Sequence, residues 1–386
     1  MILPEGRVQH SPMRFETRAV HAGGEPDPAT GAIAPPIHLS TTFEHGPAGE
    51  PHAAGHIYIR ESNPTQSRLE EALAAIEGGE AALSFGSGVG AGAACLQALE
   101  PGAHVLFHRD LYYAFRTMAV EYLPRWGMEA SFVDMTDLDA TEHALRPNTQ
   151  LVWTESPTNP TMQILDLRAI AALSKGAGAL LLVDGTFATP ALQRPLELGA
   201  DVVLHSTTKS LGGHSDVHGG ALAFRSRGEL MHRAQHNRHI LGAVASPFAS
   251  WMVLRGIRTL ACRMERQSAT ALAVARALEG NPCLRSVHYP GLESDPGHAV
   301  AMGQMSAFGA MMSLRVAGGR EGAVRAASRV KLFRNATSLG GVESLLEHRR
   351  SVESPDSPTP DDLIRVSIGL EHPDDLIEDL VQAVAV

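Results

Sequence analysis

Short apolar strands alternate with helical segments from about residue 66 to residue 245, and this alternation limits the fold more than any other feature. A helix is predicted over 66–77. Strands that recur with helices between them indicate βαβ units and a mostly parallel sheet, so we expect a large α/β domain. The predicted strands lie near residues 104–107, 130–133, 150–154, 180–184, 202–205 and 220–224.

The rest of the chain follows other patterns. With 386 residues it exceeds one typical domain. Residues 1–45 are rich in Pro, His and Gly and are expected to form an N-terminal arm, followed by the large domain over 46–245. A long helical stretch is predicted over 248–278. Shorter strands near 284–289, 310–316 and 363–368 then predict a smaller α+β C-terminal domain over 246–386.

Composition excludes several classes of protein. The net charge of −10 argues against a nucleic-acid partner, which favours a basic face. No apolar run approaches the ~20 residues of a membrane span, and the N-terminus lacks a secretory signal pattern. Three widely separated cysteines indicate reduced thiols in the cytoplasm. The nineteen histidines form no HxH or HExxH arrangement, so no metal site is predicted.

Two strand ends carry the most informative side chains. Leu180-Leu181-Leu182-Val183 ends on Asp184, and the strand 202–205 runs into Ser206-Thr207-Thr208-Lys209. Ligands of α/β proteins bind at the carboxyl ends of such strands. An amine that forms a Schiff base and a carboxylate that pairs with a pyridinium nitrogen are the groups that pyridoxal phosphate requires. The sequence therefore predicts an enzyme that uses pyridoxal 5'-phosphate.

Further residues suit the same cofactor. A glycine turn that enters a helix, as at Gly86–Gly90, offers free amides to a phosphate. Tyr58 and Arg60 form a second anion-binding candidate, although a solvated loop explains them equally well. Tyr112 follows a strand and is placed to stack on a flat ring, although such aromatic side chains also serve as plain core.

Arg365 interrupts an apolar strand near the C-terminus. A buried guanidinium without a partner is unfavourable, so Arg365 should meet a carboxylate. That carboxylate belongs either to an internal ion pair or to an amino-acid substrate. Ser338, in a Gly-rich segment, is a candidate for the wall of the same pocket.

Taken together, these segments resemble the Cys/Met-metabolism (trans-sulfuration) family of pyridoxal-phosphate enzymes. The family includes cystathionine γ-synthase, cystathionine γ-lyase and methionine γ-lyase. The resemblance runs from about residue 14 to the C-terminus. Its motifs are Tyr58-x-Arg60-x-x-Asn63-Pro64-Thr65, Ser87-Gly88, Glu155-Ser156-Pro157-x-Asn159-Pro160, Asp184-x-Thr186, Ser206-x-Thr208-Lys209, Ser338-Leu339-Gly340-Gly341 and Arg365-x-Ser367.

The resemblance implies a role for each of these residues. Lys209 is the Schiff-base lysine and proton shuttle, Asp184 pairs with the pyridine nitrogen, and Tyr112 stacks on the ring. Tyr58 and Arg60 reach the phosphate from a neighbouring subunit. The remaining cofactor contacts are Ser87, Gly88, Val89, Thr186, Ser206 and Thr208, and the substrate contacts are Asn159, Ser338 and Arg365.

The resemblance also implies an aspartate-aminotransferase-like fold (fold type I) and a homotetramer built from two active dimers. The chain departs from the family pattern at several places. Tyr112-Tyr113-Ala114 replaces a Tyr-Gly-Gly turn and is one residue shorter, and the reactive cysteine of methionine γ-lyase after the stacking tyrosine is missing. Gly185 stands where Asn is usual, and Thr337 stands where γ-synthases and γ-lyases typically carry Glu. Arg349-Arg350-Ser351-Val352-Glu353 replaces the usual Ser-Met-Thr-His stretch.

We expect a transferase or lyase that acts on C–S or C–O bonds of amino acids. γ-Replacement, in which activated homoserine and cysteine give cystathionine, is preferred because Gly340-Gly341-Val342-Glu343-Ser344 follows that subgroup. γ-Elimination by a cystathionine γ-lyase or methionine γ-lyase is the alternative. A cofactor-binding protein without activity would not need Lys209, Asp184 and Arg365 together. A nicotinamide oxidoreductase would need a GxGxxG motif with an acid about 20 residues further on, and the Gly-rich turn of this chain lacks that acid.

Overall fold

A computed structural model describes residues 13–51, 55–353 and 357–385, so the first twelve residues of the predicted arm lie outside the described residues. The larger sheet has seven strands in the order β1-β7-β6-β5-β4-β2-β3. β7 runs antiparallel to its neighbours β1 and β6, and the other neighbours are parallel. The strands are β1 (Ala81–Phe85), β2 (His104–His108), β3 (Glu129–Val133), β4 (Thr149–Glu155), β5 (Leu180–Asp184), β6 (Val202–His205) and β7 (Gly220–Phe224).

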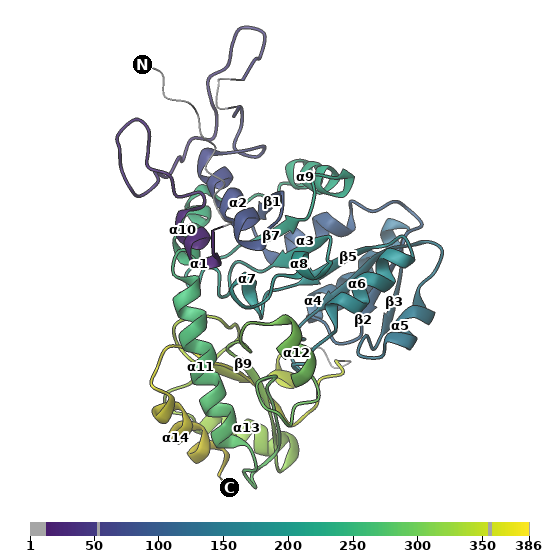
Figure 1. The fold of residues 1–386 in the computed structure, drawn as a ribbon, viewed down its shortest axis with the longest axis vertical. Helices are drawn as coiled ribbons and strands as arrows, with labels where there is room; N and C mark the ends of the chain where they lie inside the picture. Colours follow the sequence, from purple (N-terminus) through teal and green to yellow (C-terminus); the bar gives the residue numbers. More distant parts are fainter. Residues whose placement is uncertain (1–12, 52–54, 354–356, 386) are drawn as a thin grey trace.

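Helices connect these strands and cover the sheet (Figure 1), which confirms the predicted α/β architecture. They are α2 (Pro64–Glu77), α3 (Gly88–Leu96), α4 (Tyr113–Thr117), α5 (Leu138–Ala144), α6 (Leu167–Gly176), α7 (Thr189–Leu192), α8 (Pro195–Leu198), α9 (Glu229–Leu241) and α10 (Pro247–Ile257). A π-helical turn (Met118–Tyr122) and a 3-10 turn (Pro124–Trp126) follow α4.

A second sheet has five strands in the order β10-β11-β12-β9-β8. Only the pair β10–β11 is parallel. The strands are β8 (Leu284–His288), β9 (Met311–Val316), β10 (Arg334–Asn335), β11 (Leu345–His348) and β12 (Leu363–Ser367). The helices around it are α11 (Leu260–Leu278), α12 (His298–Gln304), α13 (Gly319–Arg329) and α14 (Pro373–Val384), with a 3-10 turn at Arg349–Ser351.

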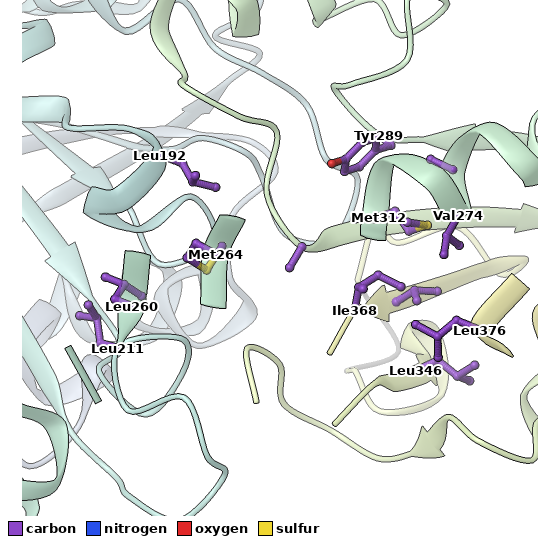
Figure 2. Close-up of a cluster of buried hydrophobic side chains, with 14 of the residues drawn as sticks. Leu192, Leu211, Leu260, Met264, Val274, Tyr289, Met312, Leu346, Ile368 and Leu376 are labelled. Carbon is purple, nitrogen blue, oxygen red and sulfur yellow. The ribbon is translucent and has the colours of Figure 1, made fainter. Parts of the chain in front are cut away.

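Helix α11 links the regions of the two sheets and runs along the second one (Figure 1). Buried side chains along this helix, among them Leu260, Met264 and Val274, belong to one continuous hydrophobic cluster. Figure 2 shows that this cluster continues through Met312 to Leu346, Ile368 and Leu376. Because one core spans both regions, side chains from the two sheets can form a common pocket.

The structure differs from the predicted elements in several places, and strands β10 and β11 of the second sheet were not predicted. The helix predicted over 248–278 is two helices, α10 and α11, separated by Arg258 and Thr259. Strand β1 was not predicted. Residues Phe15–His21, in the predicted arm, form helix α1, whose Phe15 and Ala19 are buried in the core. Within the described ranges, no helix is long and apolar enough to cross a membrane.

Candidate active site

A cavity of about 280 Å³ opens beside the carboxyl ends of β4, β5 and β6. Its walls come from both regions of the molecule, because strand ends of the large sheet face Ser338 and residues of β12 and the turn after β11. The predicted site residues that line it are Ser87, Gly88, Val89, Tyr112, Asn159, Asp184, Thr186, Ser206, Thr208, Lys209, Ser338 and Arg365.

Lys209 lies four residues beyond the end of β6. Its Nζ donates a hydrogen bond to Ser338 Oγ at 2.7 Å. Burial, and secondarily the charge of Arg365, lower the pKa of the Lys209 amine to about 8. An amine with such a pKa is partly unprotonated at neutral pH, which makes it a nucleophile.

Two carboxyl groups stand side by side at the ends of neighbouring strands, since Glu155 and Asp184 are partners in the register of β4 and β5. Burial and the nearby Asp184 raise the pKa of Glu155 well above its ordinary value. Burial also raises the pKa of Asp184, while hydrogen bonds from Thr186 lower it, and the Thr186 amide donates to Asp184 Oδ1 at 3.0 Å. Two adjacent buried carboxyl groups favour a state in which only one of them is ionised. A cation beside Asp184 would stabilise the ionised form of that carboxyl group.

The start of helix α3 offers an anion site. Ser87 caps the helix by accepting a hydrogen bond from the Gly90 amide at 2.9 Å. The amides of Gly88 and Val89 belong to the first turn, where the helix supplies no carbonyl partner. Ser206 packs against Gly88, and Thr208 is fixed by hydrogen bonds with Gly219. Backbone amides and hydroxyls thus converge on one end of the cavity.

Tyr112 precedes helix α4, and its ring lies edge-on to Tyr113 with the centroids 4.8 Å apart. The Tyr112 amide donates to Glu155 Oε2 at 2.9 Å, which fixes the residue at the strand ends. Burial, together with Tyr113, raises the pKa of the Tyr112 phenol to about 12, so the hydroxyl remains protonated.

Arg365 is buried in β12 and points into the cavity wall. It donates to Asn159 Oδ1 at 2.9 Å and to the Ser338 carbonyl at 3.3 Å, and it forms an ion pair with Glu347. The internal ion pair considered for Arg365 is therefore present. Since Arg365 also lines the cavity, it is placed to meet a carboxylate from a ligand as well.

Tyr58 and Arg60 do not reach this cavity within one chain. Tyr58 is 45% exposed, the Arg60 guanidinium lies 5.7 Å from the Tyr58 ring centroid, and Arg60 donates to the His239 carbonyl at 3.2 Å.

Two residues that sequence reasoning did not select belong to the same site. Arg349 lines the cavity, and Glu347 holds both Arg349 and Arg365. Glu155, which opens one of the motifs named from the sequence, lies beside Asp184. One feature of the sequence could have pointed to Arg349, since it lies in the stretch that departs from the family pattern.

Comparisons with known proteins bear on the chemistry of this cavity. Residues 16–385 match the model of the Cys/Met metabolism PLP-dependent enzyme family. The chain belongs to this family. It is 46% identical to "Cystathionine gamma-synthase" of Mycobacterium tuberculosis, with 95% of this chain and 96% of the relative covered. It is 40% identical to "Cystathionine gamma-lyase" of Bacillus subtilis, with 96% and 99% covered.

A solved structure agrees with this membership of the Cys/Met metabolism family. The crystal structure of metB from Corynebacterium glutamicum has a TM-score of 0.94 and 41% identity, and the match covers 96% of this chain and 98% of that one. The fold is therefore the one expected, and the protein is a pyridoxal-phosphate-dependent enzyme of trans-sulfuration chemistry.

The cavity fits the cofactor of the Cys/Met metabolism family on its own geometry. Amides of helix α3, Ser206 and Thr208 suit the phosphate, and Asp184 suits the pyridine nitrogen. The Lys209 amine lies in the same cavity with a lowered pKa, as a covalent attachment point requires.

Proposed function

We propose that this enzyme catalyses γ-replacement, in which an activated homoserine and cysteine give cystathionine. The observation that carries this proposal is the 46% identity to a cystathionine γ-synthase over nearly the whole of both chains. γ-Elimination, giving 2-oxobutanoate, ammonia and a thiol, is the second candidate. It is favoured by the 40% identity to a cystathionine γ-lyase.

A direct assay separates the two reactions. The purified enzyme is incubated with acylhomoserine plus cysteine, with cystathionine alone and with methionine alone. Replacement gives a thioether without keto acid in the first mixture, whereas elimination gives keto acid and ammonia in the second or third. Absence of thioether from the first mixture would refute the γ-synthase assignment.

We infer roles for the site residues from their positions. When bound, pyridoxal phosphate supplies an electron sink for charge that develops at the substrate's Cα. Lys209 would hold it covalently through Nζ and, once its amine is free, would take the Cα proton of the substrate before a Cβ proton is removed. Tyr112 stacks beside the ring and, as a protonated phenol, donates a hydrogen bond at the reacting end. Asp184 holds a proton on the ring nitrogen.

The substrate is oriented by the groups on the opposite wall. Arg365 binds the α-carboxylate with its planar fork, and Asn159 fixes the guanidinium through its Oδ1. Ser338 holds the Lys209 amine between the two ends of the cavity. The cofactor would be held by residues that line the same cavity as Lys209, namely Ser87, Gly88, Val89, Thr186, Ser206 and Thr208.

We propose that the active site is completed by a second copy of the chain within a homotetramer. The loops between α1 and α2 project from the body of the molecule (Figure 1), and they carry Tyr58 and Arg60. Large apolar side chains are exposed next to them, including Ile240 at 57%, Leu241 at 61% and Phe248 at 58%. An exposed apolar face of this kind favours association.

We propose that the enzyme works in the cytoplasm, because the exposed thiol of Cys262 suits a reducing compartment.

A further inference from the structure

The end of the cavity that faces the substrate carries an arginine in addition to Arg365. Arg349 begins the 3-10 turn that follows β11, and its side chain lines the cavity together with Lys209 and Arg365. The Arg349 guanidinium lies 5.9 Å from the ring centroid of Tyr113, which also lines the cavity. Arg349 therefore faces the same space as the reacting groups.

Two carboxylates hold Arg349 in place. Its Nη1 donates to Glu347 Oε1 at 2.8 Å, and its Nε donates to Glu353 Oε1 at 2.7 Å. Glu347 and Glu353 are themselves buried or nearly so, and neither is among the described residues that line this cavity. Glu347 instead lines a neighbouring hollow, which shares Thr337 with the cavity. The two acids thus hold the guanidinium, and it lines the cavity whereas they do not.

Position 337 adds no charge to this wall. Thr337 lines the cavity, and its hydroxyl donates to Glu347 Oε2 at 2.9 Å. The acids that do line the cavity, Glu155 and Asp184, lie at the strand ends beside the expected pyridine ring. The charge of Arg349 also contributes to the lowered pKa of Lys209 and opposes part of the rise in the pKa of Tyr112, so it acts on the reacting end.

We propose that Arg349 is a specificity-determining residue that forms a second anion subsite, selecting amino acids whose far end carries a carboxylate or phosphate. Arg365 takes the α-carboxylate, and Arg349 takes the anion at the end of the γ-substituent. A guanidinium pairs with both anions through charge-assisted hydrogen bonds, whereas an ammonium at the same place meets a like charge. This inference rests on the proposed reaction at Cγ, and it names the class of substituent that the pocket accepts.

Three six-carbon amino acids test the subsite in the holoenzyme without requiring turnover. L-2-Aminoadipate, L-norleucine and L-lysine share one α end and finish in a carboxylate, a methyl group and an ammonium. Their dissociation constants are measured from the change in cofactor absorbance and by calorimetry. The wild-type enzyme is expected to bind aminoadipate about tenfold or more tighter than norleucine, and lysine most weakly.

Matched variants assign the preference to one residue. Arg349→Met should equalise aminoadipate and norleucine, and Thr337→Glu should shift the order toward lysine. Arg350→Met is the control, because Arg350 pairs with Asp361 outside the cavity and its variant should keep the wild-type order. If Arg349→Met unfolds at a lower temperature than wild type, the double variant with Glu353→Gln replaces it, since it removes the carboxylate left without its partner.

Two outcomes would overturn the subsite: equal binding of aminoadipate and norleucine by the wild type, or a preference that survives in the Arg349 variants. A series of homoserine esters compares the two anions: the succinyl ester carries a carboxylate, the phosphate ester carries a phosphate, and the acetyl ester is the neutral reference. If no ester is turned over but aminoadipate is still preferred through Arg349, the proposed reaction fails and the subsite stands.

Discussion

Charge and burial act in the same direction on Lys209. Removal from water disfavours the ammonium, and the neighbouring Arg365 and Arg349 repel it, so the pKa falls to about 8. Glu347 opposes this effect but is shared between both arginines. The lysine is therefore prepared to react before any ligand arrives, and the same cations that prepare it are placed to bind anionic substrate groups.

Lys209→Ala should abolish both turnover and the visible absorbance of the bound cofactor, because the covalent attachment point is lost. The chain contains only three lysines, so reduction with borohydride followed by peptide mapping has three candidate sites. Lys175 and Lys331 are exposed, and their alanine variants serve as controls that should keep the absorbance. A label on either of them would contradict the assignment.

Cofactor uptake by the cofactor-free protein should depend on pH through the same amine. The attacking form is unprotonated, so the rate should rise with pH and level off above about 8.

The stability of the protein should depend on the same amine. Because the pKa of Lys209 in the folded protein lies below the ordinary value of 10.5, the unfolded chain binds the proton more strongly. The free energy of unfolding should therefore rise with pH between these two values, and less so in Lys209→Met. Stopped-flow absorbance and denaturant titrations measure the two effects.

Arg365→Lys should raise KM for the amino-acid substrate while the cofactor stays bound. The lysine keeps the charge but loses the bidentate fork, and loss of such a contact costs on the order of 2–5 kcal/mol. Steady-state kinetics with an amino acid and its α-amide provide the measurement. Wild type should discriminate strongly between them and the variant much less. Equal discrimination by both would leave Arg365 with only its internal ion pair to Glu347.

At the scale of elements, the sequence predicted the strands that carry the cofactor groups, because β2 and β4 to β7 are short apolar runs bounded by polar residues or glycine. It did not predict β1, whose Ala81-Ala82-Leu83 start has weak strand propensity. Nor did it predict α1, because its only two buried residues, Phe15 and Ala19, form too short a pattern to reveal a helical period.

The break between α10 and α11 has a tertiary cause that no local pattern shows. Arg263 Nη1 donates to the Ser210 carbonyl and Nη2 to the Gly256 carbonyl, both at 2.7 Å. A Cβ on Gly256 would overlap the carbonyl oxygens of the loop after Lys209, so glycine lets α10 pack directly on that loop. The helix therefore ends where it supports the active-site lysine.

The candidate site was predictable where it follows the family motifs and not where it departs from them. Lys209, Asp184 and Arg365 all lie on the cavity. The partner of Arg365, Glu347, lies 18 residues away on β11, and only the antiparallel register of β11 and β12 brings it opposite Arg365. Arg349 replaces a family motif, so resemblance gave no role for it.

Gly220 at the start of β7 should be required for cofactor binding. A Cβ there would overlap the Ser87 carbonyl oxygen and the Gly88 amide, so Gly220→Ala should displace the turn that starts α3. We expect cofactor affinity to fall by about tenfold or more, as for loss of charge-assisted hydrogen bonds. Gly176→Ala is the control, because no atom other than those of its chain neighbours and its own helix backbone lies within 4 Å of a Cβ there. Equilibrium dialysis measures both, and equal affinities would show that the turn tolerates the shift.

At the scale of the whole molecule, one hydrophobic cluster joins α2 and α10 to the second sheet through α11. Figure 2 shows the part of it that runs from Leu260 and Met264 of α11 to Met312 of β9. The cavity lies where the two regions meet, so Lys209 from one faces Ser338 and Arg365 from the other. The loops that carry Tyr58 and Arg60 project from the rest of the molecule (Figure 1), so the proposed second chain would be their binding place.

Mixing two inactive variants tests that arrangement. Arg60→Ala removes the group that we expect to reach a neighbour's phosphate, and Lys209→Ala removes the attachment point in its own chain. After subunit exchange, a hybrid dimer holds one intact site, made of Lys209 from one chain and Arg60 from the other. An equal mixture should recover about a quarter of wild-type activity, because half of the dimers are hybrids with one good site of two. Exchange is verified by mass-tagged subunits, and mixtures of each variant with itself are the controls. If exchanged subunits recover no activity, Arg60 does not complete a neighbour's site, and its contact with the His239 carbonyl is its structural role.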